Sequence, residues 1–121
     1  MAKFVFIIIM LSIIGCTIKP QKSVPEDYVA GQKYFYQVCA NCHGVDAAGG
    51  NKAPTFLQEI FLPTNFTNER IAKTILNGSS SEEMPSQRNK INDEQIKEII
   101  KYIRFSQREK GVHSSWIYGS S

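Results

Sequence analysis

Two cysteines and a histidine stand close together in the segment Cys39-Ala40-Asn41-Cys42-His43. Two thiols three residues apart lie on one side of a helical turn, where both could add to the vinyl groups of one porphyrin. The histidine that follows could then present its imidazole to the iron from the same side. The C-x-x-C-H spacing is the attachment signature of c-type haem, so it predicts one haem that is covalently bound through Cys39 and Cys42 and ligated by His43.

The same pair of thiols has other possible uses. Cys39 and Cys42 could form a disulfide, act as a thioredoxin-like redox pair or supply half of a zinc site. A thioredoxin-like site needs strands around it, and no stretch of the chain shows the two-residue alternation of a half-buried strand. Zinc needs further Cys or His ligands, and outside this motif the chain offers only Cys16 and His113.

A haem iron that only carries electrons needs a second axial ligand, and methionine is a known partner of histidine in this role. Apart from two methionines near the N-terminus, the chain has only Met84, in the polar sequence Glu83-Met84-Pro85. A methionine among such neighbours is poorly explained as filler of a hydrophobic core. We therefore expect Met84 to be the sixth ligand of the iron, and the alternative sixth ligand is His113.

The N-terminus has the pattern of a secretory signal. Lys3 precedes an apolar run, Phe4–Ile14, that only Ser12 interrupts. Eleven helical residues rise about 16 Å, which is well short of a bilayer core of about 30 Å. Residues 1–15 are therefore expected to be a signal peptide.

The residues Ile-Ile-Gly-Cys at positions 13–16 resemble the lipobox of bacterial lipoproteins. This resemblance implies that Cys16 is acylated and becomes the first residue of the mature chain, with residues 16–24 as the acylated cysteine and a polar tether. The expected location is the bacterial cell envelope, with the domain facing the periplasm or the cell exterior. Because Thr17 is not aspartate, the outer membrane is favoured if the source is Gram-negative.

Two helices are expected in the first two thirds of the chain. The first covers residues 25–38, where acidic residues in the first turn complement the helix dipole. Its inward face has spacings of three and four and comprises Tyr28, Gly31, Phe35 and Val38. The second covers residues 67–76, with Thr67 as its N-cap.

The last helix has the clearest pattern. It covers residues 92–104, with Asn92 as the cap, Gln95 in a capping-box position and Arg104 as the closing residue. Its apolar stripe comprises Ile96, Ile99, Ile100 and Ile103.

The expected fold class is all-α with long irregular loops, because residues 44–66 and 78–90 are rich in Gly, Pro and Ser. The domain is expected at residues 25–105, followed by a polar C-terminal tail at 106–121. Hydrophobic residues make up 42% of the chain, and the leader holds a large share of them. The rest of the chain has few hydrophobic residues to form a core, as expected if a group that is not protein fills its centre.

Residues 27–104 resemble the class I, monohaem cytochrome c family of bacteria. Gly31 and Phe35 stand eight and four residues before Cys39, where the family has a glycine and an aromatic residue that meet the last helix at close approach. Tyr102 is similar to their partner on the last helix. The resemblance implies a cytochrome c fold, in which three to four helices wrap around one covalent haem.

The resemblance extends to the residues around the expected ligand His43. Pro54 looks like the family's proline whose carbonyl accepts a hydrogen bond from that histidine, although Ala53 precedes it where glycine is common. Phe56 stands where the family usually has leucine and is expected to pack on the haem. The residues expected to wrap the haem are Tyr28, Tyr34, Phe35, Phe56, Phe61, Phe66, Ile71, Ile75, Ile99 and Ile103.

These features predict a monomeric electron carrier, not an enzyme, that shuttles single electrons between redox partners outside the cytoplasm. The partners are either transient or part of a respiratory complex. A net charge of +3 with mixed signs argues against nucleic acid as a partner. Basic residues that either steer an acidic partner or are ordinary solvated surface are Lys52, Arg70, Lys73, Arg88 and Lys90.

Two alternatives stay open for the function. One is a haem-based ligand sensor or enzyme-complex subunit with a labile sixth ligand. The other is a binding module without haem, in which Cys39 and Cys42 bond to each other.

Overall fold

The computed structural model describes residues 18–111, and this part of the chain is all-helical, as predicted. Between residues 18 and 111 there is no strand, and no helix is both long enough and apolar enough to cross a membrane. The elements, in chain order, are α1 (Glu26–Val38), α2 (Ala40–His43), the 3₁₀ turns η1 (Val45–Ala47) and η2 (Glu59–Phe61), α3 (Asn68–Asn77) and α4 (Asp93–Glu109).

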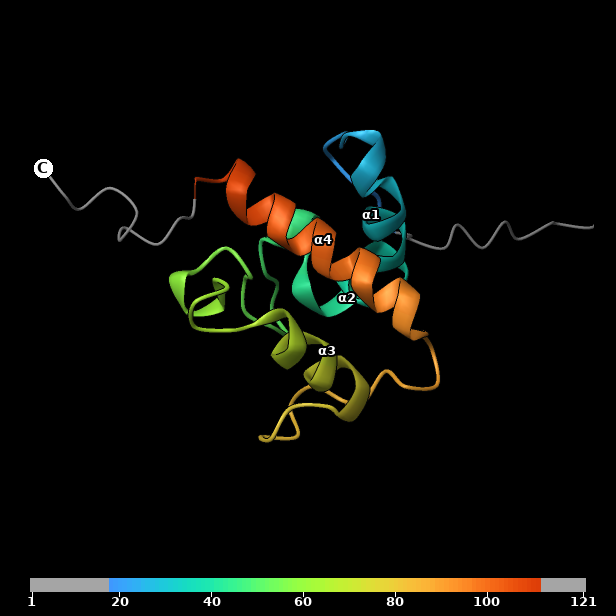
Figure 1. The fold of residues 1–121 in the computed structure, drawn as a ribbon, viewed down its shortest axis with the longest axis vertical. Helices are drawn as coiled ribbons and strands as arrows, with labels where there is room; N and C mark the ends of the chain where they lie inside the picture. The colour runs from blue at the N-terminus through green and yellow to red at the C-terminus, as the bar shows by residue number, and fades with distance from the viewer. Residues whose placement is uncertain (1–17, 112–121) are drawn as a thin grey trace, which may run out of the picture.

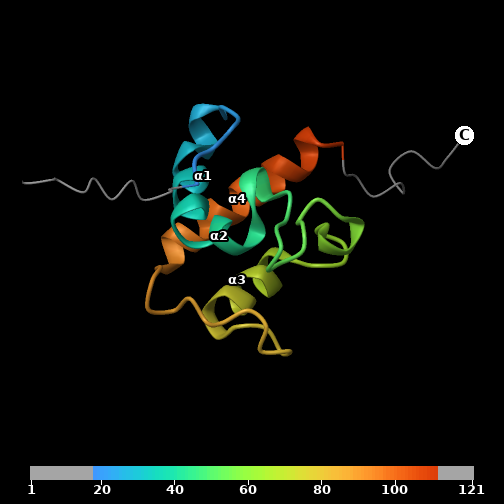
Figure 2. The same ribbon diagram turned by 180° about the vertical axis from the view of Figure 1, so that it is seen from behind.

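Helices α1 and α4 cross each other at the centre of the fold (Figure 1 and, from behind, Figure 2). Gly31 lies at the crossing, where an added Cβ atom would stand 2.0 Å from the carbonyl oxygen of Glu98. Next to it, the buried ring of Phe35 lies 5.2 Å from the ring of Tyr102. The close approach expected for these residues is therefore present, and only glycine allows it at position 31.

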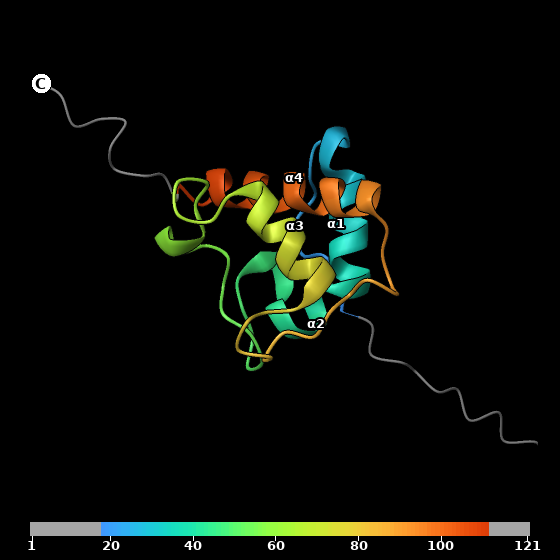
Figure 3. The same ribbon diagram turned by 60° about the horizontal axis from the view of Figure 1, so that its bottom comes forward.

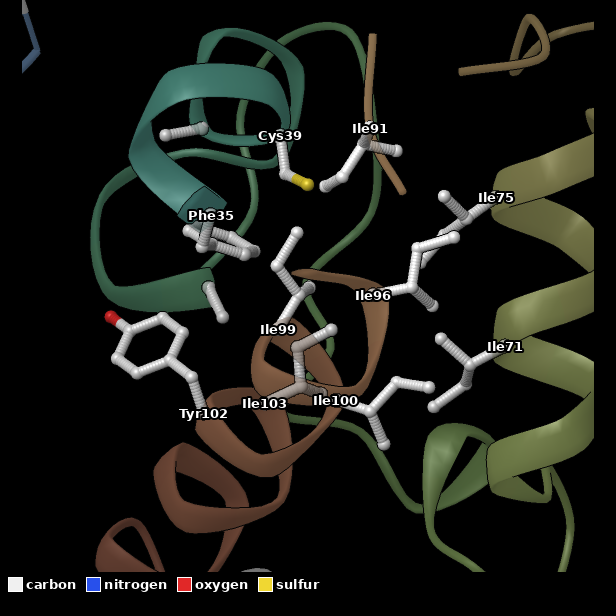
Figure 4. Close-up of a cluster of buried hydrophobic side chains, with 12 residues drawn as sticks. Phe35, Cys39, Ile71, Ile75, Ile91, Ile96, Ile99, Ile100, Tyr102 and Ile103 are labelled. Carbon is white, nitrogen blue, oxygen red and sulfur yellow. The ribbon is translucent and has the colours of Figure 1, made fainter. Parts of the chain in front are cut away.

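Helix α3 supplies the other wall of the core (Figure 4). Ile71 and Ile75 point from α3 toward the isoleucines of α4, and Figure 3 shows α2 and α3 on the same side of α4. The predicted stripe on α4 is buried throughout. Of the residues expected to wrap a haem, the buried ones are Phe35, Ile71, Ile75, Ile99 and Ile103, and the partly buried ones are Tyr28, Tyr34, Phe56, Phe61 and Phe66.

Helices α3 and α4 begin at the N-cap residues that the sequence predicts. Thr67 is the N-cap of α3, and its hydroxyl oxygen accepts from the backbone N–H of Arg70. Asn92 and Gln95 form a full capping box, in which each side chain accepts from the other residue's backbone N–H, at 2.9 and 3.0 Å. These bonds satisfy backbone donors that the first helical turn leaves without partners.

The end of α4 was predicted wrongly. The helix does not close at Arg104 but continues to Glu109, and both Ser106 and Gln107 are buried. The reason is that Gln107 faces the protein and bonds to loop carbonyls, a contact that a polar tail sequence does not reveal. Residues 1–17, with Cys16, and residues 112–121, with His113, lie outside the described range, so the predictions for them stay predictions.

Candidate functional site

The cysteine motif occupies the joint between α1 and α2. The backbone N–H of Cys39 donates to the carbonyl of Phe35 (2.7 Å), and that of His43 donates to the carbonyl of Cys39 (2.9 Å), so the chain stays helical through the motif. Cys39 is buried beside Ile91, and Cys42 is exposed (Figure 4 shows Cys39). The two thiols are not joined in a disulfide. Burial raises the pKa of the Cys39 thiol to about 12, so this thiol is protonated at neutral pH.

His43 is 8% exposed and its imidazole is held from two directions. Its Nδ1 lies 3.4 Å from the carbonyl oxygen of Pro54. The ring of Phe56 stacks on the imidazole, with a centroid distance of 4.3 Å and an angle of 25°. Burial lowers the pKa of His43 below its usual value. The imidazole is therefore neutral at pH 7, and Nδ1 faces an acceptor, which leaves Nε2 as the atom available to a metal ion.

A tight turn after His43 brings the Pro54 segment back to the imidazole. Gly44 has a φ of 80°, and an added Cβ atom there would stand 2.0 Å from the carbonyl oxygen of Gly49. Asp46 also has a positive φ, 52°, and is held by Tyr36. The Tyr36 hydroxyl donates to Asp46 Oδ1 (2.9 Å) and accepts from the Asp46 N–H (2.8 Å). Burial raises the pKa of Tyr36, so its hydroxyl remains a donor.

Met84 lies in the loop between α3 and α4 and packs, partly buried, against the same hydrophobic cluster that contains Cys39. Ser79 holds its backbone at both ends: the Ser79 N–H donates to the Met84 carbonyl (2.9 Å), and the Met84 N–H donates to Ser79 Oγ (3.0 Å). Gln87 ties the loop to α3 through its N–H and the carbonyl of Ile75 (2.8 Å). Met84 is thus positioned by its neighbours in the loop.

The residues fit haem c by the chemistry of their donor atoms. Two unpaired thiols lie on one turn with a neutral imidazole, and Phe56, Met84 and Cys39 share one apolar cluster. These are the groups that form thioether bonds and ligate a haem iron. Within residues 18–111 no three His, Cys, Asp or Glu side chains are grouped so that they could hold a metal ion, so the zinc alternative finds no further ligands there.

The basic residues are spread over the surface. Arg70 lies over the ring of Phe66, and Arg88 donates to Asn77 Oδ1 (2.7 Å). The remaining three, Lys52, Lys73 and Lys90, are exposed.

Two pairs of residues around the site were missed in the sequence. Tyr36 and Asp46 hold the turn after His43, but a hydroxyl-carboxylate pair ten residues apart has no periodic signal. Arg104 and Gln107 are buried against the segment that carries Phe56. Their signal was available, because Arg104 lies four residues after Ile100 and thus continues the buried stripe of α4.

These features define a cytochrome c domain: a C-x-x-C-H turn, a histidine whose Nδ1 faces a proline carbonyl, and two crossing helices with glycine at the crossing. Residues 26–103 match the family described as cytochrome c oxidase, cbb3-type, subunit III. The match covers more than half of the chain, so the chain belongs to this family. No curated protein sequence matches the chain. Membership implies electron transfer through a covalent haem c and redox proteins as partners.

Proposed function

We propose that this chain is a membrane-tethered electron carrier with one haem c. Cys39 and Cys42 would form the two thioether bonds, and His43 and Met84 would be the axial ligands. The observation that carries the proposal is the neutral, buried imidazole of His43 beside the thiols, with Nδ1 toward Pro54 and Nε2 left over. When bound, the haem supplies a one-electron couple between ferrous and ferric iron.

Each side chain has a role in that assignment. An Nδ1–H bond to the Pro54 carbonyl selects one tautomer of His43, orients the ring and makes Nε2 a better ligand. A methionine sulfur as the second ligand raises the reduction potential. With both axial positions taken by His43 and Met84, no coordination site is left for a substrate. This arrangement supports a carrier and argues against an enzyme.

The tether and the location belong to the same proposal. The lipobox-like sequence before Cys16 supports an acylated N-terminus and a place outside the cytoplasm, in the bacterial cell envelope. The described domain starts only a few residues after Cys16, which would keep the haem near the membrane. The family name supports a respiratory oxidase as the setting, with the redox partner either transient or another subunit.

Absorption spectra of the full chain, made in cells that attach haem c, test the haem and its ligands. We expect sharp reduced bands, haem that survives acid-acetone extraction, and a weak far-red sulfur-to-iron band in the oxidised protein. Met84→Ala should remove the far-red band and keep the covalent haem, because the thioether bonds do not involve Met84. Leu76→Ala is the matched control, since this half-buried residue of α3 packs on the same core without donating a ligand.

Two results would contradict the assignment. A colourless folded protein would exclude the cytochrome c and leave Cys39 and Cys42 to a disulfide. Haem without the far-red band, together with ready carbon monoxide binding by the wild-type ferrous protein, would make a ligand sensor or an enzyme subunit the better function. The observation that favours this second candidate is that the backbone N–H and carbonyl of Met84 both bond to Ser79 of the same loop.

Replacing the expected acylation site tests the tether. Cys16→Ser should abolish incorporation of labelled palmitate and move the protein from the membrane fraction to the soluble fraction. Cys42→Ser is the control, because it should remove one thioether bond and leave palmitate incorporation unchanged. Labelling of Cys16→Ser at the wild-type level would contradict the lipid anchor.

A further inference from the structure

Helix α4 continues beyond the family match, which ends at residue 103, and the extension carries three buried polar residues, of which Arg104 and Gln107 bond to a neighbouring loop. Arg104 is 8% exposed and Gln107 is 2% exposed. They stand three residues apart and therefore lie on one face of α4. Both face residues 56–68, the green segment that runs beside the C-terminal half of α4 (Figures 1 and 3).

Arg104 and Gln107, which we call the carbonyl clamp, bind the main chain of this segment. Arg104 Nη1 donates to the carbonyl of Phe61 (2.6 Å), and Nη2 donates to that of Phe66. Gln107 Nε2 donates to the carbonyls of Phe56 (2.9 Å) and Phe61 (3.0 Å). The two side chains also bond to each other, from Arg104 Nη1 to Gln107 Oε1 (3.0 Å).

The guanidinium of Arg104 has only neutral partners in the described part of the chain. Its Nε donates to Asn68 Oδ1 (2.9 Å), and no carboxylate lies within salt-bridge distance among residues 18–111. A buried charge is costly unless its donors are satisfied, so any shift of the Phe61 or Phe66 carbonyls would be strongly opposed. The clamp therefore restrains a segment whose own regular structure is a single 3₁₀ turn, η2.

The three clamped carbonyls belong to residues whose rings form a continuous row ending on the imidazole of His43. Phe66 contacts Phe61 (5.6 Å between centroids), Phe61 contacts Phe56 (5.5 Å), and Phe56 stacks on His43 (4.3 Å). Arg70 covers the outer end of the row, with its guanidinium 4.4 Å from the Phe66 centroid. Fixing these three carbonyls thus fixes the ring that lies against the imidazole.

We infer that Arg104 and Gln107 are positioning residues for the axial ligand: by holding the carbonyls of Phe56 and Phe61, they set the orientation of the His43 imidazole. The inference rests on the proposed function, because it assigns the clamp a role toward an iron ligand. The stacked face of Phe56 acts on the ring plane, whereas the Pro54 carbonyl acts on Nδ1. Together the two contacts leave the imidazole little rotational freedom.

The test uses the haem-loaded full chain and four variants. Gln107→Leu removes two carbonyl contacts without changing charge, Arg104→Gln removes the guanidinium, and Arg104→Lys keeps the charge but not the planar fork. Arg108→Gln is the matched control, because Arg108 is exposed on the same helix and, among residues 18–111, its side chain donates only to the Tyr28 hydroxyl. The readouts are the electron paramagnetic resonance g-values of the ferric haem and the shifts of its methyl protons, which report the imidazole plane.

We expect Gln107→Leu and Arg104→Gln to change the g-values and methyl shifts, Arg104→Lys to restore them only in part, and Arg108→Gln to match wild type. Amide hydrogen exchange between residues 56 and 66 should speed up about tenfold in the first two variants, since the restraint on this segment is lost. If Arg104→Gln does not accumulate, Gln107→Leu alone decides the question.

Two results would overturn the inference. In the first, Gln107→Leu lowers the Tm but leaves the g-values and methyl shifts at wild-type values, which is a purely structural role. In the second, only the Arg104 variant that loses its charge changes the reduction potential, with no change of the imidazole signals, which is an effect of charge alone. A wild-type chain without covalent haem would instead overturn the proposed function, so the two failures are distinguishable.

Discussion

The His43 side and the Met84 side of the candidate site start alike and are built differently. Each follows a helix that ends in a glycine of positive φ: Gly44 after α2, at 80°, and Gly78 after α3, at 82°. Each glycine N–H donates back to the helix at 2.8 Å. His43 is the last residue of α2 and is held by Pro54 and Phe56, 11 and 13 residues later, whereas the backbone of Met84 is held by Ser79, five residues earlier in the same loop.

The two proposed ligands, His43 and Met84, differ in the contacts that must break before either one can move away. Phe56, which stacks on His43, contacts Phe35 beside the crossing of α1 and α4. Displacing His43 therefore disturbs the core. Met84 can move with a loop whose neighbours Glu82, Glu83 and Pro85 are exposed. If both residues ligate a haem iron as proposed, Met84 is therefore the ligand whose displacement disturbs the core less.

The largest contrast is expected from alanine at the two glycines. Gly44→Ala should cost about 4 kcal/mol, because it adds left-handed strain of about 1–2 kcal/mol to an overpacked contact of about 1–3 kcal/mol. Gly78→Ala should cost about 2 kcal/mol, since its Cβ atom would meet the Met84 carbonyl at 2.7 Å, against 2.0 Å at Gly44. Thermal unfolding measures both losses of stability, and a larger loss for Gly78→Ala than for Gly44→Ala would contradict the expected difference between the two sides.

Removing the hydroxyl of Tyr36 on the His43 side, or that of Ser79 on the Met84 side, should give smaller losses of stability. Only the second change should also affect the far-red band. Tyr36→Phe leaves the carboxylate and the N–H of Asp46 without their partner and should cost about 2 kcal/mol, seen as a lower Tm. Ser79→Ala removes one bond to Met84 and should cost about 1 kcal/mol, but it should weaken the far-red band, which Tyr36→Phe leaves intact. Equal bands in the two variants would show that Ser79 does not position the methionine.

The smallest effect is a dependence on pH confined to the histidine side. Burial lowers the pKa of His43 below 6.5, so the unfolded chain binds a proton at a higher pH than the folded chain. The stability is therefore complete above about pH 6.5 and falls as the pH drops toward the folded pKa. In the chain without haem, the Tm should therefore decline between about pH 7 and pH 5, whereas Met84 adds nothing to this slope because a thioether binds no proton.

The chain has a second histidine, His113, so the measurement needs a control. His113→Gln should leave the slope of Tm against pH unchanged if His43 causes it. A flat profile in that variant would assign the dependence to His113 instead.

Much of the fold could be predicted because its signals are local. The caps at Thr67 and Asn92 and the isoleucine stripe of α4 each depend on spacings of a few residues, whereas the glycine at the helix crossing was implied by the family resemblance. The C-x-x-C-H motif is also a local signal, which explains why the centre of the candidate site was evident before the fold was known.

What could not be predicted depends on partners distant in sequence. The position of Arg104 on the stripe of α4 predicts its burial, but the sequence does not reveal its acceptors, which include the backbone carbonyl of Phe61, 43 residues away. The bond between Tyr36 and Asp46 depends on two positive φ values in a row, at Asp46 and Ala47, which no glycine announces. Such contacts follow from the tertiary fold and not from periodicity.

The carbonyl clamp also determines which substitutions the segment from Phe56 to Phe66 can tolerate. Because Arg104 and Gln107 hold main-chain oxygens, the restraint that they impose does not depend on the identity of the exposed side chains between the three phenylalanines. Ile60, in the middle of the segment, is 60% exposed. The outer surface of this segment can therefore diverge, or be redesigned for a new redox partner, while the two polar residues on α4 keep its path unchanged.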